Sequence, residues 1–111
     1  MYKNKQVYAV VLAAGKGTRI GFDKMLYKLD RYEVAHHSIS KFQENEFVDC
    51  IIVAAGENYD EIKQIAARFS KVKTVVKGGA TRALSVLNAL EVIETDGIVA
   101  IHDGARPYES Q

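Results

Sequence analysis

Four short apolar runs along the chain predict β-strands. They cover residues 7–14, 50–55, 73–76 and 97–101. β-branched side chains dominate these runs, and three of the four are continuously apolar rather than alternating. Continuous runs of this kind are typical of strands that are covered on both faces of a parallel sheet.

Three segments between these runs repeat apolar residues with the period of an amphipathic helix. The apolar stripes comprise Ala35, Ile39 and Phe42; Ile62, Ile65, Ala66 and Phe69; and Ala83, Val86, Leu87, Leu90 and Ile93. Thr81 is placed to cap the third helix. Because strands and helices alternate, we expect an α/β fold, a doubly wound, Rossmann-like parallel sheet of about four strands with three helices.

Composition narrows the class of protein without naming a function. The chain has 111 residues, which predicts a single domain spanning 1–111. A net charge of +1 gives no general attraction to nucleic acid or to an anionic membrane. No apolar run approaches the roughly 20 residues of a membrane helix, and the single cysteine cannot form an internal disulfide. We therefore expect a cytoplasmic protein without a nucleic-acid or membrane partner.

A glycine-rich segment follows the first predicted strand, where open α/β sheets bind their ligands. Its glycines are Gly15, Gly17 and Gly21, and its cationic residues are Lys16, Arg19 and Lys24. Backbone N–H groups and cations together suit a triphosphate. The spacing fails the phosphate-loop pattern and misses the dinucleotide fingerprint by one residue. A plain turn with solvated charges is the other interpretation.

Two further motifs, taken with this segment, carry a resemblance to a known family. In chain order the three are Leu12-Ala13-Ala14-Gly15-x-Gly17-x-Arg19-x-Gly21 with Asp23-Lys24, then Gly78-Gly79-Ala80-Thr81-Arg82-x-x-Ser85-Val86, then His102-Asp103-Gly104-Ala105-Arg106-Pro107. Their order and spacing, from about Val7 to Pro107, strongly resemble the 2-C-methyl-D-erythritol 4-phosphate cytidylyltransferases of isoprenoid biosynthesis. The related ribitol-5-phosphate cytidylyltransferases share most of these motifs.

The resemblance implies a reaction and a set of residue roles. The family transfers a cytidylyl group from CTP to a sugar-alcohol phosphate, releases pyrophosphate and uses Mg²⁺. Arg19 and Lys24 then correspond to the catalytic cations on the triphosphate, and Asp103 to the metal ligand. The nucleotide, CTP or CMP, would contact Ala14, Gly15, Gly17, Gly79, Arg82 and Ser85. Gly79 and Ser85 correspond to the positions that recognise the cytosine, whereas Arg82 could equally be a solvated surface arginine.

Length is the first departure from the family pattern. Family members are about twice as long, which implies a truncated nucleotidyltransferase fold that lacks the acceptor-binding half. The chain would then be the nucleotide-binding half of a cytidylyltransferase, not catalytically competent alone. The fourth strand, residues 98–101, would also be an unpaired edge, so we expect self-association through it.

Three residues suggest an alternative function. Leu84 stands where the family motif has an aspartate, Tyr32 replaces a glycine-lysine type of turn, and Met25 follows Lys24. We expect Leu84 at the edge of the core stripe of the third helix, and a leucine cannot accept hydrogen bonds from a base. If Met25, Tyr32 and Leu84 lay together, they would form a protein-contact patch. The alternative is a non-catalytic α/β scaffold, natural or engineered, that binds another protein.

Overall fold

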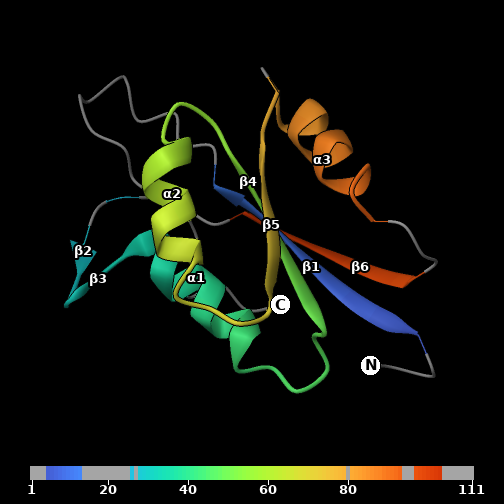
Figure 1. Cartoon of the computed structure of the whole chain (residues 1–111), viewed down its shortest axis with the longest axis horizontal. Helices are drawn as coiled ribbons and strands as arrows, with labels where there is room; N and C mark the ends of the chain where they lie inside the picture. Colours follow the sequence, from blue (N-terminus) through green and yellow to red (C-terminus); the bar gives the residue numbers. More distant parts are fainter. Residues whose placement is uncertain (1–4, 14–25, 27, 80, 94–96, 104–111) are drawn as a thin grey trace.

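A four-stranded parallel sheet forms the centre of the molecule (Figure 1). The structure, a computed structural model, describes residues 5–13, 26, 28–79, 81–93 and 97–103. Its strands are β1 (Gln6–Ala13), β4 (Cys50–Ala55), β5 (Val72–Lys77) and β6 (Gly97–Asp103), in the order β5-β4-β1-β6. The chain moves outward from β1 to β5 and then returns to the other side of β1, which is the doubly wound arrangement.

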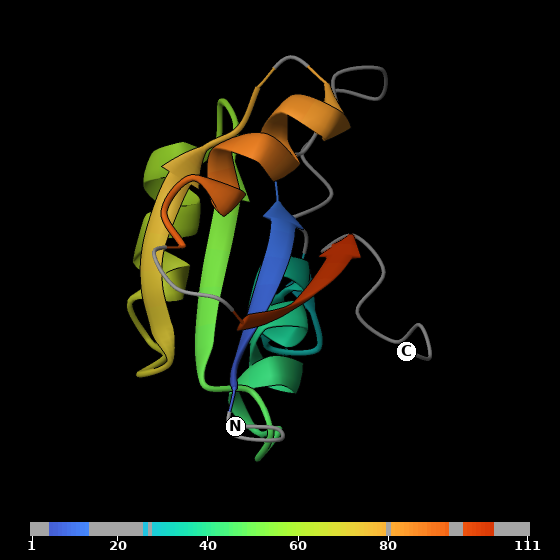
Figure 2. The same ribbon diagram turned by 90° about the vertical axis from the view of Figure 1, so that its right-hand side faces the viewer.

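Three helices cover the two faces of this sheet. In Figure 2, α3 (Arg82–Leu90) lies in front of the sheet, and α1 (Val34–Gln43) and α2 (Tyr59–Ala66) lie behind it. The predicted fold class, with its four strands and three helices, is thereby confirmed. None of the helices among the described residues is long and apolar enough to cross a membrane.

A small antiparallel hairpin precedes α1 and was not predicted from the sequence. It pairs β2 (Lys28–Leu29) with β3 (Tyr32–Glu33). Asp30 in its turn has a φ of 61°, a left-handed conformation that aspartate tolerates better than most residues. Two-residue strands carry too little periodicity to be recognised in a sequence.

The core lies on both faces of β1 and β4, as the continuous apolar runs predicted. Val7, Ala9, Val11 and Ala13 of β1 pack on the α1 and α2 side. The alternate residues Tyr8, Val10 and Leu12 pack on the α3 side. Successive side chains of a strand point to opposite faces, so a strand covered on both sides must be apolar at every position.

The apolar stripe predicted for the third helix is wrong in part. The sheet-facing side of α3 buries Ser85 and Ala89, whereas Leu87 is 54% exposed. Ala83 and Leu90, also in the predicted stripe, lie on the exposed side too. Only Val86 and Ile93 of that stripe pack against the core, both partly buried. A serine and an alanine have small side chains, so the helix can lie close to the sheet, and this decided which side faces inward.

Two further predictions concern the start of α3 and the end of β6. Thr81 caps α3 as predicted, since its hydroxyl accepts a hydrogen bond from the Leu84 N–H at 3.2 Å. β6 continues to Asp103, two residues beyond the predicted end. His102 therefore lies in the strand, where it is buried and meets the Phe42 ring edge-on at 5.3 Å between centroids.

Candidate functional site

The carboxyl ends of the four parallel strands meet at one edge of the sheet. Ala13 pairs with Ala55, Ala55 pairs with Lys77, and Leu12 pairs with Asp103. The three sequence motifs therefore begin at this edge, directly after β1, directly after β5 and at the end of β6. Open α/β sheets bind ligands at this place, and we take it as the candidate nucleotide site.

The first motif contributes only its beginning to the described structure. Leu12 and Ala13 lie in β1 and are buried. The predicted site residues Ala14, Gly15, Gly17, Arg19, Lys24 and Met25 lie outside the described residues. Their roles therefore stay predictions, attached to a segment whose starting point, Ala13, is known.

Gly79 and Ser85, the two predicted cytosine-recognising residues, are in direct contact. The Gly79 N–H donates a hydrogen bond to Ser85 Oγ at 3.1 Å. A Cβ atom on Gly79 would overlap the Cβ of Leu84, so no larger residue fits between the β5–α3 turn and the helix. Ser85 is 4% exposed, which fixes its hydroxyl at the start of α3. The second motif thus forms one compact backbone–hydroxyl unit beside the end of β5.

Arg82 and Leu84 occupy the exposed side of the first turn of α3. Leu84 is 45% exposed and is not part of the core, contrary to the expected position at the edge of the core stripe. Arg82 is exposed as well. Both side chains therefore lie at the surface next to the Gly79–Ser85 unit, where a ligand or a solvent molecule can meet them.

Asp103 ends β6 and pairs in register with Leu12. No group of three or more His, Cys, Asp or Glu residues in the part of the chain that the structure describes could hold a metal ion. Mg²⁺ is commonly held by one or two carboxylates together with substrate phosphates and water. The role of Asp103 as a metal ligand therefore stays a prediction.

Asn58 connects the ends of β1 and β4 and was missed from the sequence. Its side chain is 5% exposed. Nδ2 donates to the Ala13 carbonyl at 2.9 Å, and Oδ1 accepts from the Gly56 N–H at 3.1 Å. The only available signal was a polar residue shortly after a buried strand, which reads equally well as an ordinary helix cap. The Gly78 N–H adds a bond to the Ala55 carbonyl at 2.6 Å, so β1, β4 and β5 are tied together at the edge.

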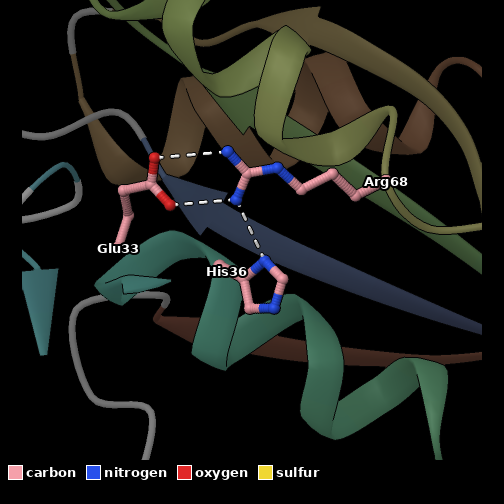
Figure 3. Close-up of polar contacts among 3 residues, drawn as sticks. All are labelled: Glu33, His36 and Arg68. Atoms are coloured by element: carbon pink, nitrogen blue, oxygen red, sulfur yellow. Dashed lines mark hydrogen bonds and ion pairs between the residues drawn. The ribbon is translucent and has the colours of Figure 1, made fainter. Parts of the chain in front are cut away.

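A second polar cluster holds the hairpin against α1 and the end of α2 (Figure 3). Arg68 Nη1 lies 3.0 Å from Glu33 Oε1 and 3.1 Å from His36 Nδ1. A guanidinium can only donate, so His36 Nδ1 is the acceptor. Tyr32 stacks on the His36 ring at 4.1 Å between centroids. Burial, followed by the Arg68 charge, lowers the pKa of His36. The hydrogen bond from Arg68 likewise lowers the pKa of Glu33.

The position of Tyr32 in this cluster bears on the predicted protein-contact patch of Met25, Tyr32 and Leu84. Tyr32 lies with α1, on the face that α1 and α2 cover, and Leu84 lies on α3, which covers the opposite face (Figure 2). Met25 lies outside the described residues. Tyr32 and Leu84 are therefore separated by the sheet and do not share one surface.

Comparison with known proteins gives one consistent family. The family model of 2-C-methyl-D-erythritol 4-phosphate cytidylyltransferase matches residues 7–111. A protein of that name from Clostridium tetani is 38% identical over 115 residues, an alignment covering 99% of this chain and 47% of the relative. The chain spans about half the length of the curated relatives it matches.

Solved structures show the same fold. A 4-diphosphocytidyl-2C-methyl-D-erythritol synthase from Anaerococcus prevotii superposes with a TM-score of 0.79 at 27% identity, covering 96% of this chain and 46% of that one. A Mycobacterium tuberculosis protein, solved in complex with manganese, superposes with a TM-score of 0.73 at 21% identity, covering 96% of this chain and 54% of that one. At that identity the second likeness supports the fold alone.

Proposed function

The chain belongs to the 2-C-methyl-D-erythritol 4-phosphate cytidylyltransferase family, and from this premise we propose that it supplies the CTP-binding half of such an enzyme. The observation that carries the proposal is the Gly79–Ser85 unit, which follows β5 at the same edge of the sheet as the ends of β1 and β6. It combines a close backbone approach with a fixed hydroxyl, and a few polar groups held in this way orient a ligand in its pocket.

The proposed reaction requires positive charge near the triphosphate of CTP. An oxygen of the acceptor phosphate attacks the α-phosphorus of CTP, the bond to the bridging oxygen of the β-phosphate breaks, and pyrophosphate leaves. Negative charge on the triphosphate has to be stabilised throughout, and the protein does this mainly by positioning and electrostatics. We assign this work to Arg19 and Lys24, with backbone N–H groups of Ala14, Gly15 and Gly17 as further donors.

Asp103 is the residue of this chain that would hold a divalent cation. When bound, Mg²⁺ would neutralise charge on the triphosphate oxygens. The pairing of Asp103 with Leu12, two residues before Ala14 in the sequence, supports a common place for metal and phosphates. We expect metal binding to depend on the nucleotide, because the described residues offer no group that could hold the ion by itself.

We propose that these residues supply CTP binding and that the transfer reaction also needs the half of the relatives that they do not span, since the chain covers about half the length of the curated relatives it matches. The alternative function as a protein-binding scaffold rested on a patch that includes Tyr32 and Leu84, and these two residues lie on opposite faces of the sheet. No observation favours that alternative over nucleotide binding.

Calorimetric titration with CTP and Mg²⁺ tests the proposal, with ATP as the comparison nucleotide. We expect CTP to bind in preference to ATP, and both Arg19→Ala and Asp103→Ala to weaken the binding. Arg31→Ala is the matched control, because Arg31 is an exposed arginine in the turn of the β2–β3 hairpin. Absence of CTP binding at millimolar concentration would overturn the proposal, as would equal losses in Arg19→Ala and Arg31→Ala.

A further inference from the structure

The Asn58 side chain forms hydrogen bonds outside the helix that it precedes. It is the residue before α2, where an asparagine normally accepts a hydrogen bond from a backbone N–H of the first helical turn. Its side chain makes no such bond. It instead spans from the β4–α2 turn to β1, donating to Ala13 and accepting from Gly56. The side chain therefore connects two strand ends rather than stabilising its own helix.

The bond to Ala13 lies at the carboxyl end of β1. Ala13 is the last described residue of β1, where it pairs with Ala55 of β4. Asn58 thus adds a side-chain hydrogen bond to the strand pairing at this end. The glycine-rich segment begins one residue later.

Burial makes this bond a rigid constraint. Asn58 is 5% exposed, and the bond to Ala13 is enclosed by protein. A hydrogen bond shielded from water is electrostatically stronger than an exposed one, so loss of a buried donor costs more free energy than loss of an exposed one. By contrast, Asn88 bonds the Lys77 carbonyl from an exposed position, where water can replace it.

We propose that Asn58 is a positioning residue for nucleotide binding, which holds the carboxyl ends of β1 and β4 in place at the candidate nucleotide site. This inference rests on the proposed CTP-binding function. Asn58 acts through Ala13 and needs no contact with the nucleotide. Under the proposed function, the glycine-rich sequence that follows Ala13 supplies the contacts to the phosphates. Loss of the Asn58 side chain should therefore lower nucleotide affinity through the phosphates rather than through the base.

The test replaces the amide with a carboxylate of the same shape. Asn58→Asp keeps the oxygen that accepts from Gly56 and turns the donor toward Ala13 into an acceptor. We expect CTP affinity to fall by about tenfold or more at neutral pH, because two acceptors then face each other. The affinity for CMP, with fewer phosphates, should fall less. Asn58→Ser is the second variant, because it also removes the donor and keeps a residue suited to a helix cap.

Gln43→Glu is the matched control. Gln43 also uses its amide in two directions, donating to Ser70 Oγ at 2.9 Å and accepting from the Lys71 N–H at 2.9 Å. It is the last residue of α1, and its partners Ser70 and Lys71 directly precede β5, at the opposite end of the sheet from Ala13. The same chemical change should therefore leave CTP affinity unaltered there, whatever it does to the free energy of unfolding.

Hydrogen exchange provides a readout that does not need the nucleotide. Amide exchange at the strand ends that Asn58 contacts, Ala13 and Gly56, should accelerate in Asn58→Asp and Asn58→Ser but not in Gln43→Glu. Wild-type CTP affinity and wild-type exchange in a folded Asn58 variant would overturn the inference. If the wild-type chain itself failed to bind CTP, the proposed function would fail instead, so the two failures are distinguishable.

Discussion

Single residues set the geometry at the start of α3. Gly79 lies so close to Leu84 that a Cβ atom would overlap it, and the same glycine donates its N–H to Ser85. The glycine is therefore required by helix packing, in addition to any approach of a base. The resemblance to the family indicated that this residue matters, whereas the contact with Leu84 supplies a reason that is independent of the ligand.

Gly79→Ala should destabilise the protein. The added methyl group would force the first turn of α3 away from the end of β5, and overpacking of this kind costs about 1–3 kcal/mol in free energy of unfolding. Urea denaturation followed by circular dichroism measures the change. Ala83→Ser, on the exposed side of the same turn, should change the free energy by about 0.5 kcal/mol or less. A Gly79→Ala protein of wild-type stability would show that the helix can shift without cost.

Leu84→Asp should tighten CTP binding while leaving the fold intact. Leu84 is exposed, so its loss removes little core packing. A carboxylate in the first turn is also favoured by the helix dipole, and it restores the hydrogen-bond acceptor of the family motif. Calorimetry with CTP measures the effect. Leu87→Asp, one turn further along the same exposed side, should bring no gain. Equal or weaker binding by Leu84→Asp would contradict the assignment of this position to the base.

His36 should make stability depend on pH. Burial and the Arg68 charge lower its pKa below the ordinary value of 6.5. The unfolded chain therefore takes up this proton at a higher pH than the folded protein, so stability falls as the pH drops through that value toward the folded pKa. Glu33 acts in the same direction at lower pH, because Arg68 lowers its pKa from 4.5 and its contribution is lost on further acidification.

His36→Asn isolates the histidine contribution. The asparagine oxygen can still accept from Arg68, but it does not titrate. We expect the free energy of unfolding to decrease less between about pH 8 and about pH 5.5 than in the wild type, measured by urea denaturation at each pH. An identical decrease in both proteins would place the pH dependence elsewhere.

At the scale of elements, β6 is the exposed edge of the sheet. Within the described residues it pairs with β1 alone, and Ile98 and Ile101 are 36% and 39% exposed on its two faces. Residues 97–102 contain no lysine, glutamate or proline, the residues that commonly protect such edges. An unprotected strand edge offers unpaired N–H and C=O groups to another chain.

We predict that this chain self-associates through β6. Sedimentation velocity over a range of concentrations should show a dimer or larger species, and Ile98→Lys should shift the distribution toward monomer. Phe47→Lys is the control, since Phe47 is an exposed apolar residue in the turn between α1 and β4. A monodisperse wild-type monomer at high concentration would contradict the prediction.

The apolar periodicity predicted the buried side of α1 and α2, but not that of α3. α1 and α2 bury the predicted residues Ala35, Ile39, Phe42, Ile62 and Ile65. α3 has apolar residues around much of its circumference, so the period alone did not determine which side faces the sheet. The Gly79–Ser85 contact and the small Ala89 decided it in the folded protein.

At the scale of the whole molecule, the strand order brings three separate motifs to one edge. β1 lies between β4 and β6, so the segments that follow Ala13, Lys77 and Asp103 start close together. This convergence follows from the parallel strands with helical crossovers that the alternation in the sequence predicted, together with the strand order of the folded protein.

Sequence alone therefore determined the α/β class, the strands of the sheet and the family, because buried parallel strands and glycine-rich motifs leave strong local patterns. It could not reveal Asn58, the Arg68 cluster, the side that α3 buries or the separation of Tyr32 from Leu84. Each of these depends on atoms that are distant along the chain. The bond from Asn58 to Ala13 spans 45 residues, and the pair Arg68–Glu33 spans 35. Only the tertiary structure brings such groups within hydrogen-bonding distance, since periodicity describes one element at a time.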